Sequence, residues 1–456
     1  MKKLIILFVC FMLICPVNYS QNWSPLGSGM NNYVWELAVY NNELVAGGWF
    51  TSAGGVSAYY IAKWNGISWA PLGSGMDNEV YSLTVYNNEL IAGGKFTTAG
   101  GISANRVAKW NGSYWAPLGN GIGNGISDNV LTLKVYNNEL IAGGVFNTAG
   151  GISANGIAKW NGSSWAPLSS GMNDLVYALT VYNNELIAGG WFTSAGGISA
   201  NRIAMWNGSS WAPLGNGMNH YVLELTVYNN DLVAGGVFSM AGGIYANHIA
   251  KWDGSSYAAL GSGTNGEVYA LTVYNNELIA GGYFTSAGGL SANYTAKWDG
   301  SSWASLGSGV NAWVEVLTVY SGELIAGGGF NIAGGVNANY IAKWNGNVSI
   351  KKISEKLPYN FSLSQNYPNP FNPSTKIKFS IPLSRGVPRS TSGRGVSVRL
   401  TIYDLLGREV AALINEQLKP GTYEIEFDGA NYPSGVYFYK LMTDSFNESK
   451  RMVLIK

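Results

Sequence analysis

The sequence predicts an all-β protein: a seven-bladed β-propeller of four-stranded blades, followed by a small C-terminal β-sandwich. Three observations predict this fold class. The chain of 456 residues is rich in Gly (61 residues) and aromatic side chains (13%) and poor in charged residues (12%). This composition is typical of many strands and turns and argues against disorder or a coiled coil. A motif of 46 residues recurs along the chain, and a different composition begins near residue 350.

The first segment predicts export. Two lysines precede an apolar run from Leu4 to Cys15, which is too short to span a bilayer. This pattern predicts a secretory signal peptide over residues 1–20, with cleavage near Ser20. Both cysteines, Cys10 and Cys15, lie in this segment, so we expect no disulfide and no thiolate metal site in the processed chain.

The repeat indicates seven blades. A Val-Tyr pair marks each copy, and its spacing is 46 residues except for one of 50, which indicates a four-residue insertion around residues 122–125. Repeats of roughly 40 to 50 residues with four strands each are the signature of propeller blades. The pairs begin at Val39, Val85, Val135, Val181, Val227, Val273 and Val319.

Each copy predicts four short antiparallel strands, from the inside of the ring outward. Asn41-Asn42 predicts a type I′ turn between the first and second strands, because Asn tolerates a positive φ. The second strand is apolar at successive positions, as expected of a strand covered on both faces. It ends in Gly47-Gly48, which predicts close approach of a neighbouring backbone. Asn65-Gly66 predicts a further hairpin turn, between the third and fourth strands.

The fourth strands predict how the ring closes. Each opens with an aromatic residue, but no such motif follows the third strand of the last copy, which ends at Trp344. The missing motif stands at Trp23, directly after the signal peptide. We therefore expect the segment around Trp23 to complete the last blade and leave no open edge. The aromatic residues after the first six third strands are Trp69, Trp115, Trp165, Trp211, Tyr257 and Trp303.

The repeats resemble kelch-like and Rax2-like propeller repeats over residues 22–350, since Gly-Gly and a downstream Trp mark each blade. This resemblance implies a fold rather than an activity, because propellers host many functions.

Four positions of the repeat vary between copies, and all four are predicted to lie on one face of the ring. They stand just before the first strand, two residues later, at the end of the second strand and at the start of the third. Trp, Tyr and Arg recur there, and recognition surfaces are enriched in these side chains. Packing between blades is the alternative interpretation. The predicted binding face comprises Trp49, Tyr60, Lys95, Arg106, Trp191, Arg202, His248, Tyr283, Tyr294 and Tyr340.

Signals for catalysis or metal binding are weak. The chain contains two histidines, His220 and His248, and a metal site or catalytic triad needs several matched groups. A Glu that follows the turn between the first and second strands in six copies is interpreted as a solvated hairpin charge: Glu43, Glu89, Glu139, Glu185, Glu277 and Glu323. We expect no cofactor, no metal and no catalytic residue.

The C-terminal part has a different charge and different motifs. Residues 21–348 carry 10 Lys and Arg against 17 Asp and Glu, whereas residues 349–456 carry 15 against 9. Residues 351–360 are predicted to be a linker. Residues 361–456 contain Tyr-Pro-Asn-Pro-Phe-Asn-Pro, Tyr-Asp-Leu-Leu-Gly-Arg-Glu-Val and Pro-Ser-Gly-Val-Tyr, among alternating stretches that predict a β-sandwich. Residues 384–397 are predicted to be a flexible inserted loop.

These motifs closely resemble the type A C-terminal sorting domain of the type IX secretion system. The resemblance implies export across the outer membrane of a Bacteroidetes-like bacterium, followed by release or attachment at the cell surface. It makes the type IX secretion machinery an expected partner.

The predicted function is that of a non-enzymatic, monomeric propeller that binds an extracellular glycan or protein through one face. A formal net charge of +1 gives no reason to expect a nucleic-acid partner. One alternative is a hydrolase or lyase acting on extracellular polysaccharide, with Glu79 and Glu267 in the central opening. The other is a surface-layer or adhesion protein without a discrete ligand.

Overall fold

A computed structural model describes residues 22–123, 128–345, 351–354, 357–382, 396–429, 432–443 and 445–456. These residues form strands, turns and bends without any helix, which confirms the all-β prediction. Accordingly, none of them belongs to a helix that could cross a membrane. The predicted signal peptide lies outside the described residues, as do part of the insertion near residue 124 and most of the predicted loop 384–397.

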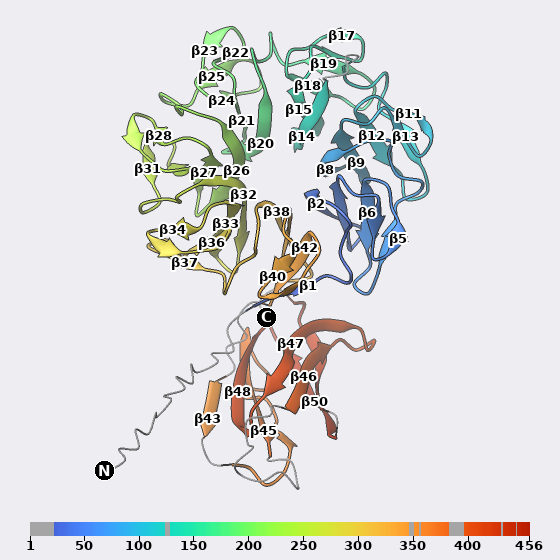
Figure 1. The fold of residues 1–456 in the computed structure, drawn as a ribbon, viewed down its shortest axis with the longest axis vertical. Coiled ribbons are helices and arrows are strands. Elements are labelled where there is room, and N and C mark those ends of the chain that lie inside the picture. The colour runs from blue at the N-terminus through green and yellow to red at the C-terminus, as the bar shows by residue number, and fades with distance from the viewer. Residues whose placement is uncertain are drawn as a thin grey trace, which may run out of the picture.

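Within the described residues, seven four-stranded antiparallel sheets lie around a common axis (Figure 1). We number these blades 1 to 7 along the chain. From the inside outward, their strands are β2 (Val34–Tyr40), β3 (Glu43–Gly48), β6 (Ile61–Trp64) and β7 (Trp69–Pro71) in blade 1; β8 (Val80–Tyr86), β9 (Glu89–Gly94), β12 (Val107–Trp110) and β13 (Trp115–Pro117) in blade 2; β14 (Asn129–Tyr136), β15 (Glu139–Val145), β18 (Ile157–Trp160) and β19 (Trp165–Pro167) in blade 3; β20 (Val176–Tyr182), β21 (Glu185–Gly190), β24 (Ile203–Trp206) and β25 (Trp211–Pro213) in blade 4; β26 (Val222–Tyr228), β27 (Asp231–Gly236), β30 (Ile249–Trp252) and β31 (Tyr257–Ala259) in blade 5; β32 (Glu267–Tyr274), β33 (Glu277–Tyr283), β36 (Thr295–Trp298) and β37 (Trp303–Ser305) in blade 6; and β38 (Val314–Tyr320), β39 (Glu323–Gly328), β42 (Ile341–Asn345) and β1 (Asn22–Pro25) in blade 7.

The N-terminal strand closes the ring, as predicted. β1 pairs antiparallel with β42, so that Trp23 lies opposite Trp344, and the innermost strands β2 and β38 pack against each other. The indole of each outermost-strand Trp donates a hydrogen bond to a Leu carbonyl of the preceding blade. In blade 5, a tyrosine hydroxyl reaches the same carbonyl. The bonds are Trp23–Leu306 (3.3 Å), Trp69–Leu26 (3.0 Å), Trp115–Leu72 (2.9 Å), Trp165–Leu118 (3.0 Å), Trp211–Leu168 (3.2 Å), Tyr257–Leu214 (2.8 Å) and Trp303–Leu260 (2.8 Å).

Two close approaches require the paired glycines, one between neighbouring blades and one within a blade. A Cβ on Gly47 would lie 2.6 Å from Cγ1 of Val80 in the next blade, and one on Gly48 would lie 2.2 Å from the Tyr33 carbonyl oxygen. The predicted close approach is therefore confirmed. The turn prediction also holds, since Asn41 and Asn42 have φ values of 50° and 61°.

Two local features differ from the sequence-based expectation. The connection after Trp64 is a four-residue loop rather than a two-residue turn, because Trp64 pairs with Trp69. Within this loop, the Asn65 side-chain oxygen accepts hydrogen bonds from the backbone N–H groups of Ile67 and Ser68, both at 2.9 Å.

Each blade also contains an unpredicted two-stranded hairpin between its second and third strands. These hairpins are β4 (Ser52–Ala53) with β5 (Val56–Ser57), β10 (Thr98–Ala99) with β11 (Ile102–Ser103), β16 (Thr148–Ala149) with β17 (Ile152–Ser153), β22 (Ser194–Ala195) with β23 (Ile198–Ser199), β28 (Met240–Ala241) with β29 (Ile244–Tyr245), β34 (Ser286–Ala287) with β35 (Leu290–Ser291), and β40 (Ile332–Ala333) with β41 (Val336–Asn337).

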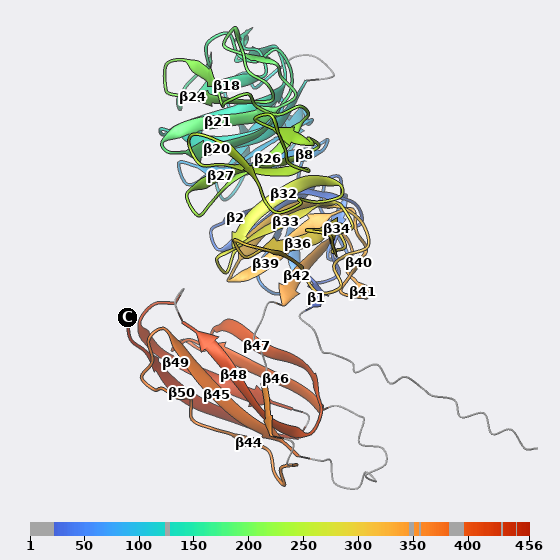
Figure 2. The ribbon, with the colours of Figure 1, turned by 90° about the vertical axis from the view of Figure 1, so that its left-hand side faces the viewer.

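The C-terminal part is a sandwich of two four-stranded sheets (Figure 2). One sheet has the order β43-β48-β45-β44 and the other β47-β46-β49-β50, and their facing side chains form one apolar core. The predicted linker differs in part, because Lys351–Ser354 forms β43 and pairs with β48. Val396 and Ser397, predicted to end the loop, begin β46. The remaining strands are β44 (Ser362–Leu363), β45 (Ser374–Ile381), β46 (Val396–Tyr403), β47 (Glu409–Leu418), β48 (Gly421–Asp428), β49 (Gly435–Met442) and β50 (Asn447–Leu454).

Candidate functional site

The variable positions of the repeat meet at one end of each blade. In blade 1, the Trp49 N–H donates to the Tyr33 carbonyl (2.9 Å), and the Gly48 N–H donates to the Tyr60 carbonyl (3.0 Å). The equivalent bonds recur around the ring, and the Asn-Asn turns and four-residue loops lie at the other end of the strands. We call the end that carries the ten predicted residues the variable rim, and the other end the opposite rim.

The residue before the third strand has an unusual backbone conformation in every blade. Its φ lies between 63° and 68°, the left-handed region that glycine favours. Only blade 3 places a glycine there, Gly156. The other six copies carry Tyr60 (65°), Arg106 (63°), Arg202 (68°), His248 (64°), Tyr294 (63°) and Tyr340 (65°).

One aromatic cluster spans blades 7 and 1. The Tyr33 ring contacts four others, at centroid distances of 5.6 Å to Trp35, 5.9 Å to Trp49, 5.2 Å to Trp313 and 5.7 Å to Tyr340. Trp49 remains 46% exposed. We call these five residues the blade 7–1 cluster.

A second cluster spans blades 4 and 5 and includes a cation. The Arg202 guanidinium lies over the Trp191 ring at 3.9 Å, an arrangement in which the ring face attracts the charge. Trp191 also contacts Tyr221 (3.9 Å) and His220 (4.9 Å), and Tyr221 contacts Tyr177. Burial lowers the pKa of Arg202 from its usual value. We call Tyr177, Trp191, Arg202, His220 and Tyr221 the blade 4–5 cluster.

In blade 2, two of the predicted rim residues are engaged by the protein itself. Arg106 is only 7% exposed, and its guanidinium donates to the backbone carbonyls of Asp128 (2.6 Å), Lys95 (3.1 Å) and Phe96 (3.2 Å). It thereby fastens blade 2 to the start of blade 3. Lys95 lies 3.8 Å from the Glu79 carboxylate.

Blades 5 and 6 carry the remaining predicted residues. Tyr283 is 56% exposed and contacts Tyr294 at 5.9 Å. His248 is half-buried, and burial lowers its pKa. Glu267 accepts a hydrogen bond from the Tyr269 hydroxyl, as Glu79 does from Tyr81 in blade 2. The two glutamates named in the hydrolase alternative are therefore each bonded to a tyrosine of their own blade.

Sequence reasoning missed a group of charges around the central axis. Glu36, Lys134, Glu224 and Glu315 lie on the innermost strands of blades 1, 3, 5 and 7, and Glu36 interacts electrostatically with the other three. Burial raises the pKa of Glu36 and Glu224 to about 8 and that of Glu315 to about 7. The signal in the sequence is a departure from the repeat, since most copies place Ser, Thr, Ala or an apolar residue at these positions.

Tyr59 was also missed. Six copies have Asn at this position, and each Asn side chain donates to a carbonyl in the loop that follows the outermost strand of its own blade. Tyr59 takes the place of this Asn in blade 1 and is 50% exposed. The Asn bonds are Asn105–Asn120 (3.5 Å), Asn155–Ser170 (3.2 Å), Asn201–Asn216 (3.2 Å), Asn247–Ser262 (3.1 Å), Asn293–Ser308 (3.1 Å) and Asn339–Ser28 (3.1 Å).

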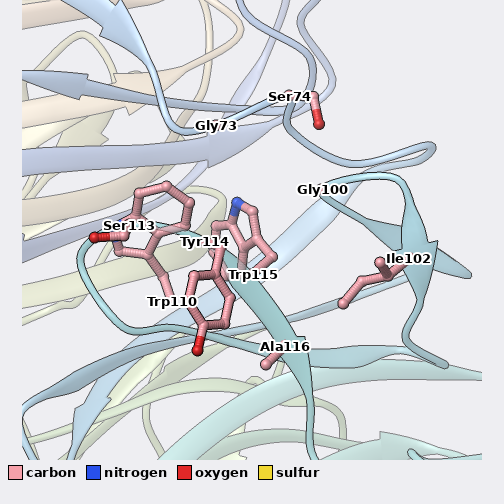
Figure 3. A pocket seen from close by; sticks show the side chains of 9 residues that line it. All are labelled: Gly73, Ser74, Gly100, Ile102, Trp110, Ser113, Tyr114, Trp115 and Ala116. Atoms are coloured by element: carbon pink, nitrogen blue, oxygen red, sulfur yellow. The ribbon is translucent and has the colours of Figure 1, made fainter.

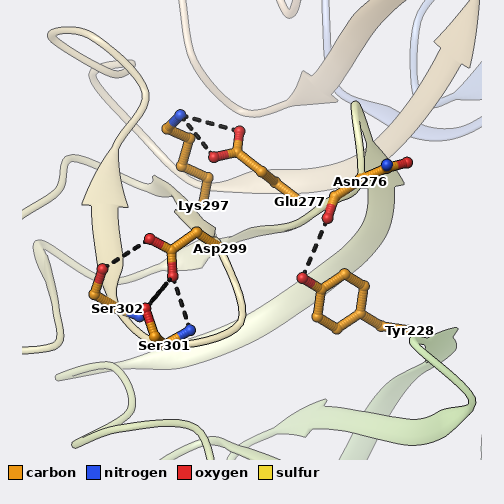
Figure 4. A network of polar contacts seen from close by, with 7 residues as sticks. All are labelled: Tyr228, Asn276, Glu277, Lys297, Asp299, Ser301 and Ser302. Carbon is orange, nitrogen blue, oxygen red and sulfur yellow. Dashed lines mark hydrogen bonds and ion pairs between the residues drawn. The ribbon is translucent and has the colours of Figure 1, made fainter.

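The opposite rim carries repeated structural contacts (Figure 4). Glu277 pairs with Lys297 at 2.9 Å within blade 6, and the Tyr228 hydroxyl donates to the Asn276 carbonyl of the next blade at 3.2 Å. The Asp299 carboxylate accepts the N–H groups of Ser301 and Ser302, both at 2.8 Å. The recurring Glu of the second strand therefore pairs with a Lys of the third strand in blades 1, 2, 3, 6 and 7.

A shallow hollow lies away from the variable-rim residues (Figure 3). Gly73 and Ser74 of the loop after β7 border it on one side, and Trp110, Tyr114 and Trp115 of blade 2 on the other. None of the ten predicted residues lines it. Among the described residues, no three His, Cys, Asp or Glu side chains are grouped so as to hold a metal ion.

Comparison with known proteins identifies the C-terminal part. Residues 365–456 match the family model of the secretion system C-terminal sorting domain. No curated protein matches the chain. The predicted sorting domain is thus confirmed, and the chain is a type IX secreted protein that is released outside the cell or attached to its surface.

Proposed function

We propose that this type IX cargo is a non-enzymatic binding protein whose variable rim holds an extracellular glycan or protein. The observation that carries the proposal is the left-handed backbone at the start of the third strands. A side chain in this conformation costs roughly 1–2 kcal/mol per residue relative to glycine. Strained residues of this kind cluster at ligand-binding sites.

The seven copies provide an internal comparison for this argument. Gly156 occupies the position without strain, whereas six copies keep a large polar or aromatic side chain. Arg106 has a structural role that accounts for it, because three backbone carbonyls hold its guanidinium. Tyr60, Arg202, His248, Tyr294 and Tyr340 are only partly buried and lie at the end of the blades where the copies differ most.

The two rims differ in how far their residues vary between blades: the opposite rim is uniform, as expected of a scaffold, and the variable rim is not, as expected of a binding surface. The opposite rim repeats the same ion pairs and turns from blade to blade. The variable rim gathers unlike residues, including exposed aromatic rings, and such rings dominate the energetics of recognition surfaces.

The test replaces the strained side chains with glycine, the residue that blade 3 already uses. The purified protein is first screened on an array of glycans and against extracellular proteins. We expect Tyr60→Gly, Arg202→Gly and Tyr340→Gly to change the melting temperature little, because relieved backbone strain offsets the lost side-chain contacts, while weakening binding of the best hit. Unchanged binding in all three variants would refute the proposal. An assay for reducing-sugar release over a polysaccharide panel tests the enzymatic alternative, because binding alone releases no product.

A further inference from the structure

We infer that the main ligand site of the variable rim lies on blade 1, where the half-exposed rings of Trp49 and Tyr59 bind the sugar rings of a neutral polysaccharide. This inference rests on the proposed function and names its location and ligand class.

Tyr59 departs from the repeat at a position with a structural role. In six blades the equivalent Asn ties the second-to-third connection to the loop after the outermost strand. Such a hydrogen bond contributes about 1 kcal/mol. Blade 1 gives up this bond and exposes half of the Tyr59 side chain instead. Because Tyr in place of Asn removes a stabilising contact and adds an exposed ring, we attribute the Tyr59 side chain to ligand binding.

Trp49 is both exposed and held in place by neighbouring rings. About half of Trp49 is exposed, and the Tyr33 ring packs against its indole at a centroid distance of 5.9 Å. Tyr33 is in turn held by Trp35, Trp313 and Tyr340. Trp49 is therefore ordered before a ligand arrives, which lowers the entropic cost of binding. In blade 4, by contrast, Trp191 is largely covered by Arg202, His220 and Tyr221.

The charge of the propeller favours a neutral ligand. The blade 7–1 cluster contains only Trp and Tyr. On the innermost strands of the same two blades, burial raises the pKa of the Glu36 and Glu315 carboxyls to about 8 and about 7. The propeller as a whole carries 17 acidic against 10 basic residues over positions 21–348, which disfavours an acidic polymer.

The small area of the two exposed rings favours a sugar over a protein as the ligand. A Trp or Tyr side chain offers roughly 150–250 Å² when fully covered, so two half-exposed rings offer about 200 Å². A stable protein–protein interface needs about 800 Å² on each partner. The C–H groups on one face of a hexopyranose ring match the negative face of an aromatic ring, and two rings hold a short stretch of such a chain.

The experiment uses the intact protein and substitutions that the repeat itself supplies. Tyr59→Asn restores the residue of the other six blades, and Trp49→Val introduces the residue of blades 3 and 5. Trp191→Val and Tyr283→Val make the equivalent change in blades 4 and 6. Tyr114→Ser is the matched control, because Tyr114 is an exposed tyrosine (63%) on the opposite rim where most copies have Ser. Binding is measured with soluble neutral polysaccharides, a glucan, a mannan and a xylan, and with a polyuronate.

We expect one of the neutral polymers to bind and the polyuronate to bind more weakly. Trp49→Val and Tyr59→Asn should each weaken binding about tenfold or more. The melting temperature of Tyr59→Asn should stay equal or rise, which separates a lost contact from misfolding. Tyr114→Ser should bind like the unmodified protein.

Two results would overturn the inference while the proposed function stands. One is loss of binding in Trp191→Val or Tyr283→Val but not in the blade 1 variants, and the other is preference for the polyuronate or for a protein. Binding that no rim variant changes would refute the proposed function itself.

Discussion

The indole Nε1 of Trp23 donates a hydrogen bond of 3.3 Å to the carbonyl oxygen of Leu306, which lies 283 positions later in the chain. Trp23 is 2% exposed, and its ring contacts Trp344 at 5.3 Å. An equivalent hydrogen bond joins each of the remaining six pairs of neighbouring blades, with a tyrosine hydroxyl as the donor in blade 5. Blade 7 is therefore fastened to blade 6 by a strand from the other end of the propeller, and the ring has no free edge there.

Removing this contact should destabilise the propeller. We expect Trp23→Ala to lower the free energy of unfolding by about 3–5 kcal/mol, because a large buried ring and its hydrogen bond are lost. Urea denaturation followed by tryptophan fluorescence measures the change. Trp23→Tyr is the matched control, since Tyr257 reaches the equivalent Leu214 carbonyl in blade 5 at 2.8 Å, and it should lose less than half as much. Equal losses for both variants would contradict this explanation.

The buried hydroxyl of Thr295 marks a position where a substitution should stabilise the protein. Thr295 is fully buried at a position where the other six copies have Ile or Val, and its hydroxyl has no hydrogen-bond partner among the described residues. An unsatisfied buried hydroxyl costs about 1–3 kcal/mol. Thr295→Val keeps the shape and removes this cost, so its melting temperature should rise in differential scanning calorimetry. A lower melting temperature would show that the hydroxyl does have a partner.

The glycine pairs predict a steric coupling between blades. A Cβ on Gly189 would lie 2.5 Å from Cγ1 of Val222 in the next blade. We expect Gly189→Ala to destabilise the protein by about 1–3 kcal/mol. The double variant with Val222→Ala should lose less than the sum of the two single changes, because the second substitution makes room for the first. Additive losses in chemical denaturation would argue against direct contact.

The carboxyls around the central axis predict a dependence of stability on pH. Burial raises the pKa of Glu224 to about 8 in the folded protein, well above its value in an unfolded chain. The folded state then holds a proton that the unfolded state has released, so stability falls as pH rises from about 4.5 to 8. Glu224→Gln cannot titrate, and its melting temperature should exceed that of the unmodified protein at pH 8 by roughly 2–4 °C, with a smaller gap at pH 5. A gap that does not change with pH would contradict the raised pKa.

Much of the fold could be predicted from the sequence because the chain contains seven copies of one repeat, and a feature shared by the copies can be recognised by comparing them. The copies locate the turns at Asn41-Asn42 and the glycines that blades need for close approach, and the motif at Trp23 indicates how the last blade closes. The hairpins such as β4–β5 were missed, because strands of two residues leave no periodic pattern. The loop after Asn65 was mistaken for a two-residue turn, because Asn-Gly also begins a longer loop in which the Asn side chain binds the backbone.

The candidate site could be predicted less completely. Comparison of the copies identified the variable positions, which lie together at one rim. It did not distinguish Arg106, which holds two blades together, from Arg202, which lies over Trp191. That distinction depends on which carbonyls come within reach when the ring closes. Tyr59 was overlooked because its position is constant in the other six copies, and the hydrogen bond that makes Asn the rule there is visible only in the structure.

The most direct test of the central claim is hydrogen–deuterium exchange of the intact protein with and without its best ligand. The account predicts slower exchange in the connections of the variable rim, above all in residues 49–60 and 310–314. The Asn-Asn turns and four-residue loops should exchange as before. Protection confined to those turns and loops would place the ligand on the opposite rim and contradict the account.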